Sequence, residues 1–320
     1  MPALLSRLMR RGRSPDDPGS ARPGEIDLRA SGVRVVIVPE RGGRITALEL
    51  GGRQWLAEDE VTPNAADAAR GGSTGYEECF PTVAACRLVS RNSGLGIDIP
   101  ALGELRTMRP AVRVTTLDGA LEAVSTWTGD RLAYRFTRGV RVSPGVVRMR
   151  YATTNTGAAS MPFIWASNVA MPLGPTTRIS LPESTRGRVL AQSGVDFLGV
   201  GAEHKWPRFR TAKKLVDMTK PDEVAPRYAC HLSFDMPAGV IGISEGADHI
   251  EARYDETKIP QLGLALRKRV GTGLARGLTL QPAIGTPDVL AHGAGVSAGV
   301  PWLEPGETRE WEISWRAPAE

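Results

Sequence analysis

The chain has 320 residues, of which 41% are hydrophobic, and a formal net charge of +5 at pH 7. This length supports one large β domain or two smaller ones, and because no run of eighteen apolar residues occurs, we expect no membrane span. Residues 1–24 hold five arginines and two aspartates, which is +3 of the +5; the remaining +2 is too balanced for a nucleic-acid-binding face.

Residues 1–24 are polar and rich in proline and glycine, which predicts a disordered leader before a single domain at residues 25–320. This segment lacks the apolar core and the small-residue cleavage site of a secretory signal, so we expect a cytoplasmic protein. A weak membrane-surface role is the alternative for its few apolar residues, Leu4, Leu5, Leu8 and Met9.

From residue 25 onward the chain consists of short β-type segments separated by glycine and proline. Residues 33–38 are rich in β-branched side chains, and residues 45–50 and 53–55 flank a Gly-Gly turn, which predicts a strand followed by a hairpin. The other predicted strands are residues 112–116, 120–128, 132–137, 146–155, 228–235, 240–244, 278–282 and 311–315.

Helical periodicity over eleven or more residues is scarce, and residues 211–219 are expected to form at most a turn or two of helix. Many short strands with this punctuation predict an all-β fold, a large antiparallel β-sandwich. The sequence has no repeat of solenoid or propeller type and no composition break after residue 25, which favours one domain.

The chain has few groups suited to redox or metal chemistry: Cys79, Cys86, Cys230, His204, His231, His249 and His292. An odd cysteine count without a Cys-x-x-Cys pair indicates reduced, partly buried thiols in a reducing compartment. A catalytic thiol would need a histidine partner that the spacing does not identify. The histidines lack metal-ligand spacing, so we expect no metal site and no cofactor. We interpret His231, within a predicted strand, as a core or edge histidine.

Six sequence segments carry motifs, each weak alone: Gly-Gly-Arg-Ile-Thr-Ala-Leu (42–48) with Gly-Arg-Gln-Trp-Leu (52–56), Gly-Tyr-Glu-Glu-Cys-Phe-Pro-Thr (75–82), Ile-Pro-Ala-Leu-Gly-Glu-Leu (99–105), Pro-Phe-Ile-Trp-Ala-Ser-Asn (162–168), Leu-Gln-Pro-Ala-Ile-Gly-Thr-Pro-Asp (280–288) and Leu-Glu-Pro-Gly-Glu-Thr-Arg-Glu-Trp (303–311). In this order and spacing they resemble the aldose 1-epimerase (galactose mutarotase-like) superfamily, especially its atypical bacterial members. The resemblance covers roughly residues 25 to 318. It implies a β-sandwich of the galactose mutarotase type, with the site in a cleft on one face.

The resemblance also implies which positions carry the chemistry. In the family, a glutamate takes the proton of the anomeric hydroxyl, a histidine protonates the ring oxygen, and a second histidine hydrogen-bonds the sugar. Each proton-transfer group contributes about 10²–10⁴ in rate. In this chain the acid position holds Asn168, the base position holds Gln281 and the second histidine position holds Leu102.

Amides keep the hydrogen-bonding reach of these side chains but do not transfer protons near neutral pH. We therefore expect a sugar or glycosylated small molecule as ligand, bound with altered or weak isomerase activity, and ordinary glucose or galactose mutarotation absent or very slow. The alternative is a non-catalytic carbohydrate-binding or regulatory module. No nucleic-acid or membrane partner is expected, and the protein is expected to be a monomer or homodimer.

Other residues near the motifs are candidates for recruited chemistry. Glu78, Glu104, Asp288 and His204 are candidate acids or bases, with a structural carboxylate paired to an arginine as the alternative for the glutamates. His204 lies in a predicted loop long enough to cover a pocket.

Two further ligand contacts are expected. Arg70 can hold a phosphate or carboxylate of the ligand. Trp165 can stack on a sugar face, or it can lie in the core beneath the pocket. A pocket carboxylate or histidine with a perturbed pKa would favour an enzyme, whereas a cleft lined by amides, Leu102 and aromatics would favour a binding module.

Overall fold

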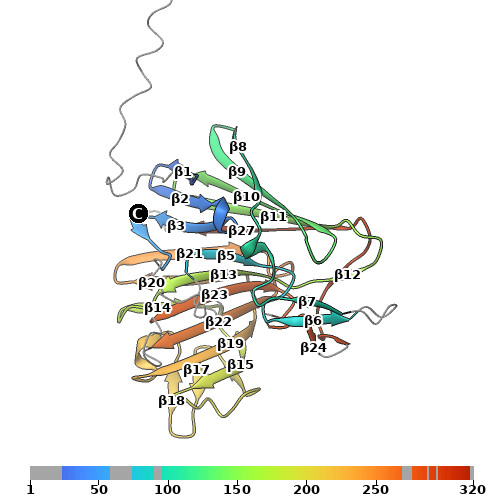
Figure 1. The fold of residues 1–320 in the computed structure, drawn as a ribbon. Helices are drawn as coiled ribbons and strands as arrows, with labels where there is room; N and C mark the ends of the chain where they lie inside the picture. Colours follow the sequence, from blue (N-terminus) through green and yellow to red (C-terminus); the bar gives the residue numbers. More distant parts are fainter. Residues whose placement is uncertain are drawn as a thin grey trace, which may run out of the picture.

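The computed structural model describes residues 24–57, 74–89, 96–268, 276–286, 288–292 and 295–317. Over these ranges the chain folds into strands and three short 3-10 helices, and no α-helix occurs in them. Figure 1 shows two large twisted sheets. Within the described ranges, no helix has the length and apolar character needed to cross a membrane.

The larger antiparallel sheet has thirteen strands in the described residues. Their spatial order is β1 (Ile26–Ala30), β2 (Val33–Val38), β3 (Arg44–Leu50), β5 (Tyr76–Cys79), β13 (Trp165–Pro172), β23 (Gly277–Ile284), β22 (Gln261–Lys268), β19 (Tyr228–Asp235), β15 (Arg186–Ser193), β16 (Glu203–Lys205), β17 (Arg208–Arg210) and β18 (Leu215–Asp217), with β4 (Arg53–Gln54) paired to β3.

The smaller antiparallel sheet has eight strands in the same residues. Their order is β14 (Thr177–Ser180), β20 (Val240–Glu245), β21 (Asp248–Tyr254), β27 (Thr308–Arg316), β11 (Val146–Asn155), β10 (Tyr134–Ser143), β9 (Ala120–Thr128) and β8 (Ala111–Leu117). The remaining elements are the pairs β6 (Cys86–Val89) with β7 (Gly96–Ile99), β12 (Met161–Pro162) with β26 (Trp302–Leu303) and β24 (Ala291–His292) with β25 (Gly295–Val296), and the 3-10 helices η1 (Pro39–Arg41), η2 (Leu105–Thr107) and η3 (Pro221–Glu223).

The all-β prediction is confirmed, and the predicted strands at residues 33–38, 120–128, 146–155 and 228–235 coincide with β2, β9, β11 and β19. The helical turn expected at residues 211–219 is wrong, because this segment forms the turn and second strand of the β17–β18 hairpin. The Thr211 hydroxyl oxygen accepts the N–H groups of Lys213 and Lys214, which closes the turn. The predicted leader, apart from Gly24, lies outside the described residues.

The two sheets enclose one large apolar core, to which most of their strands contribute alternate side chains. On β19, for example, Tyr228, Leu232 and Phe234 are fully buried in this core. Each such side chain contributes about 1.5–3 kcal/mol of transfer free energy. Alternation also means that the residues between them, including His231, point to the opposite face of the larger sheet.

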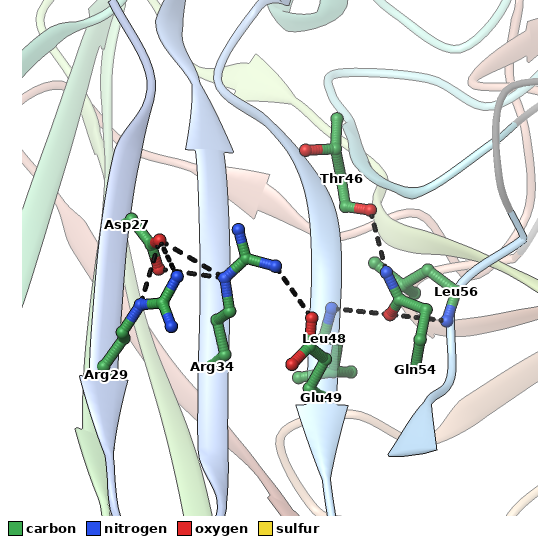
Figure 2. Close-up of polar contacts among 8 residues, drawn as sticks. All are labelled: Asp27, Arg29, Arg34, Thr46, Leu48, Glu49, Gln54 and Leu56. Carbon is green, nitrogen blue, oxygen red and sulfur yellow. Dashed lines mark hydrogen bonds and ion pairs between the residues drawn. The ribbon is translucent and has the colours of Figure 1, made fainter. Parts of the chain in front are cut away.

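Charged side chains form a row on the first strands of the larger sheet, as Figure 2 shows. The Asp27 carboxylate accepts hydrogen bonds from Arg29 and Arg34, and Arg34 also donates to Glu49 at 2.8 Å. On β4, the Gln54 side chain accepts a backbone N–H of β3 at 2.9 Å. Because β1 lies at the sheet edge, this charge disfavours pairing with a strand of another chain.

A buried carboxylate joins the two sheets. Glu78 on β5 accepts hydrogen bonds from Arg138 at 3.1 Å, from the Tyr151 hydroxyl at 3.2 Å and from the Trp165 indole at 2.9 Å. Burial raises the pKa of the Glu78 carboxyl, and the Arg138 guanidinium opposes that rise. Arg138 and Tyr151 belong to the smaller sheet, so this network fixes the register of β5 and β13 against the opposing layer.

Arg138→Met should lower the free energy of unfolding by about 3–5 kcal/mol, because it leaves the Glu78 carboxylate buried without its ion-pair partner. Adding Glu78→Gln should recover part of that loss by removing the unpaired charge. Arg188→Met, which breaks an exposed pair with Glu203, should change stability little. Urea denaturation compares the variants, and an Arg138→Met protein as stable as the wild type would contradict this role.

Candidate functional site

A cleft of about 440 Å³ lies on the face of the larger sheet that points away from the core. This volume is within the range of small-molecule sites. Its polar lining comes from β13, β23, β22, β19 and β15 and from the segment after β23, namely Asn168, Gln281, Thr279, Arg267, His231, Gln192, Ser193 and Asp288. Neighbouring strands therefore contribute most of the polar groups, on a rigid floor.

Small residues on β22 allow polar side chains of its two neighbours to meet across it. Gly263 lies opposite Gln281 of β23, and Ala265 lies opposite His231 of β19. Neither β22 residue has a side chain long enough to separate its neighbours, so His231 reaches Gln281 over the strand that divides them.

Three side chains form a hydrogen-bonded row across the floor. The His231 Nε2 atom lies 3.0 Å from Gln281 Oε1, and Gln281 Nε2 donates to Asn168 Oδ1 at 3.0 Å. A carbonyl oxygen only accepts, so Nε2 of His231 carries the hydrogen in this arrangement. The neutral imidazole then has its lone pair on Nδ1.

The wall of the cleft is mostly apolar and includes Val83, Ala84 and Leu102. The N–H groups of Val83 and Ala84 donate to the Asp288 carbonyl at 3.2 and 2.8 Å, and the Leu102 N–H donates to Val83 O at 2.6 Å. Three chain segments distant in sequence are thereby tied together. A second apolar cluster, which includes Cys79, supports the wall from the same side of the sheet.

The loop that carries Leu102 has an unusual backbone. Leu102 has φ 63°, a left-handed conformation that costs a non-glycine residue about 1–2 kcal/mol. Gly103 follows with φ 71°, and a Cβ there would collide with the Phe80 backbone. Packing of Gly103 against Phe80 and the Leu102 N–H bond to Val83 hold this loop, which presents the apolar Leu102 side chain at the cleft.

Burial lowers the pKa of His231 from its ordinary 6.5, and the Arg267 guanidinium lowers it further. The hydrogen bond with Gln281 and the charge of the Asp288 carboxylate act in the opposite direction and raise this pKa. His231 is therefore neutral at pH 7 and able to accept a proton. Burial also lowers the pKa of Arg267 on the adjacent strand.

The structure brings together four of the residues singled out in the sequence: Asn168, Gln281, Leu102 and Asp288 all line the cleft. Arg70 lies outside the described residues. Further polar residues of the lining received no ligand role from sequence reasoning: His231, Arg267, Thr279, Gln192 and Ser193. Alternation within residues 228–235 predicts that His231 lies on the sheet face opposite the core. It does not predict which strands lie next to this one, and so it does not predict the contact with Gln281.

The other candidates have partners elsewhere and do not line the cleft. Glu78 and Trp165 belong to the core network between the sheets. Glu104 accepts the Arg131 backbone N–H at 3.1 Å. These positions support structural roles, including the alternative of Trp165 as a core residue beneath the pocket.

His204 is also fully engaged away from the cleft. Its Nε2 atom lies 2.9 Å from the Phe197 carbonyl oxygen, and its Nδ1 accepts the Arg210 N–H at 3.2 Å. The ring stacks on Phe209 with centroids 4.6 Å apart. Its segment is the strand β16 and not the predicted loop, because it pairs antiparallel with β15 and its ring packs with Phe197 and Phe209.

No protein-family model and no curated protein sequence matches the chain. Solved structures do. The Slr1438 protein from Synechocystis sp. PCC 6803 matches with a TM-score of 0.68 at 18% identity, over 94% of this chain and 97% of that one. A putative aldose 1-epimerase from Escherichia coli K12 matches with a TM-score of 0.61 at 16% identity, over 92% and 99%.

A galactose mutarotase related enzyme from Lactobacillus acidophilus matches with a TM-score of 0.65 at 12% identity, over 92% of this chain and 97% of that one. At these identities the likeness establishes the fold. The chain has the galactose mutarotase-like β-sandwich, which confirms the fold expected from the motifs.

The charges around His231 give directional predictions for its titration. Asp288→Asn should lower the pKa of His231 further, and Arg267→Gln should raise it, because each removes one of two opposing charges. Nitrogen-detected NMR of the imidazole measures both. A wild-type midpoint at or above 6.5, or shifts of the reverse sign, would contradict the placement of these groups.

The same pKa has a consequence for stability. Between the lowered native pKa of His231 and its ordinary 6.5, the unfolded chain binds more protons than the folded one. The contribution of His231 should therefore reduce stability as pH falls below 6.5. Denaturation at several pH values should show a shallower acid dependence in His231→Gln than in wild type, and an unchanged slope would count against it.

Proposed function

We propose that this protein binds a sugar or a glycosylated small molecule in the cleft, with altered or weak isomerase activity of the aldose 1-epimerase type. The row from His231 through Gln281 to Asn168 carries the proposal. Sugar hydroxyls both donate and accept, and the row offers uncharged groups of both kinds on a rigid floor. The wall at Val83 and Leu102 suits the C–H face of a pyranose.

Altered chemistry follows from the residues that replace the family's acid and base. Asn168 and Gln281 lie side by side and hydrogen-bond to each other, which supports retention of the family's site positions. Neither amide is a proton carrier at neutral pH. Structures of similar fold include putative aldose 1-epimerases, and this supports an isomerase ancestry.

A non-catalytic binding or regulatory module is the second candidate, favoured by the mutual pairing of these two amides. The presence of His231 and Asp288 in the cleft favours an enzyme. The three cysteines are free thiols, which supports a reducing, cytoplasmic location. We propose a monomer or homodimer.

Wild-type protein should bind at least one simple pyranose saturably, with D-glucose and D-galactose as the first probes in calorimetric titration. Asn168→Leu should weaken that binding about tenfold or more, because it removes polar partners on the floor and leaves the Gln281 NH₂ group without its acceptor. Ser244→Ala, on β20 of the other sheet, is the control. Equal affinity in wild type and Asn168→Leu would remove Asn168 from the ligand contacts.

Exchange between the anomers of these sugars, followed by NMR at micromolar wild-type protein, should be very slow, far below the rates of typical enzymes. The double variant Asn168→His with Gln281→Glu should exchange faster, since it supplies both proton carriers. Wild-type turnover at typical enzyme rates, on the order of 1–10³ per second, would contradict the interpretation of the two amides as disabling. A double variant that binds sugar without faster exchange would show that the cleft geometry has also changed.

A further inference from the structure

We propose that His231 is the catalytic proton carrier of this cleft, its Nδ1 taking the proton of a bound sugar's anomeric hydroxyl and returning it to the ring oxygen. This inference rests on the proposed function and adds the residue that performs the residual isomerisation. One imidazole would then serve in place of the family's separate acid and base.

Position is the first support for this role. Of the histidines whose side chains the structure describes, His231 is the one that lines the cleft. His204 is engaged with Phe197 and the Arg210 backbone, and His249 pairs with Ser244 on the smaller sheet. His231 lies on the floor, beside the two amides that replace the family's acid and base.

The second support is the orientation of the ring. Gln281 gives its NH₂ group to Asn168 Oδ1, so its carbonyl oxygen faces His231 and fixes the hydrogen on Nε2. Among the described residues, Nδ1 of His231 has no hydrogen-bond partner. The row of amides therefore selects one tautomer and leaves the basic nitrogen for a ligand.

The chemistry needs only one such group, because the anomeric oxygen and the ring oxygen are bonded to the same carbon. Nδ1 takes the anomeric proton, the C1–O1 bond becomes a carbonyl as the electron pair moves in, and the C1–O5 bond breaks. The ring oxygen takes the electrons of that bond and then the proton from Nδ1. After rotation about C1–C2, the reverse steps close the ring on the other face, and no oxidant or co-reactant is consumed.

The charges that face His231 suit a transient imidazolium. Asp288 approaches from the wall and stabilises the protonated ring, while Arg267 on β22 opposes it. Burial keeps the resting ring neutral at pH 7, so it begins as a base. A single proton-transfer group contributes about 10²–10⁴ in rate, which agrees with weak activity.

The test measures anomer exchange and binding on the same samples of full-length protein, with D-glucose and D-galactose as probes. After the buffer rate is subtracted, His231→Gln should lower the exchange rate about 10²-fold or more, because it removes the one proton-transfer group. It should still bind the probes saturably, because glutamine can still donate to Gln281 and keep the row of amides in place. His249→Gln, on β21 of the smaller sheet, should match wild type in both measurements.

A pH profile of wild type keeps the test independent of whether the variant folds. The exchange rate should rise with pH to a plateau, with a midpoint that equals the NMR titration midpoint of His231 and lies below 6.5. Exchange that is unchanged in His231→Gln, a rate midpoint unrelated to that titration, or sugar binding with no exchange above buffer would each overturn the inference and leave sugar binding intact. Absence of binding would overturn the proposed function itself, and this inference with it.

Discussion

The buried Glu78 carboxylate is the constraint on which the rest of this sandwich depends. It receives hydrogen bonds from both sheets, including that of the Trp165 indole on β13. With Trp165 held on the core face, strict alternation puts Asn168 on the opposite face. A slip of one residue would exchange Asn168 with Val169 and turn an apolar side chain into the cleft. An ion pair in the core thus determines which groups a ligand meets outside it.

The polar floor of the cleft depends on the alternation of large and small side chains on β22. Large side chains of β22 and β19 point inward, and the outward positions of β22 next to His231 and Gln281 are the small residues Ala265 and Gly263. Their size leaves room for a hydrogen bond between side chains two strands apart. The floor strands are therefore polar on the face toward the cleft and apolar on the face toward the core. Because their core-facing side chains are tightly packed, the cleft-facing residues have little freedom to rearrange.

The β-sandwich and most of its strands could be predicted from the sequence, because alternation and turn residues are local signals. The motifs, whose order is visible along the chain, also predicted that Asn168 and Gln281 lie in the cleft. The position of His231 in the cleft could not be predicted, because it depends on the register of β19, β22 and β23, which no local signal specifies. The prediction for residues 211–219 was wrong for a related reason, because their strand forms only by pairing with β17.

The strained backbone at Leu102 has a consequence for selectivity. Floor amides and an imidazole leave buried polar groups unpaired when a ligand lacks the matching hydroxyl, and such mismatches are rejected strongly, by about 10⁴–10⁵ in favourable sites. An apolar wall tolerates an added hydroxyl far better, with discrimination of about 10². Because Leu102 is held in place by its own loop, this asymmetry is built in before any ligand arrives. Toward the proposed sugar ligand, the cleft is therefore expected to be strict at one edge of the ring and permissive toward substituents at the other.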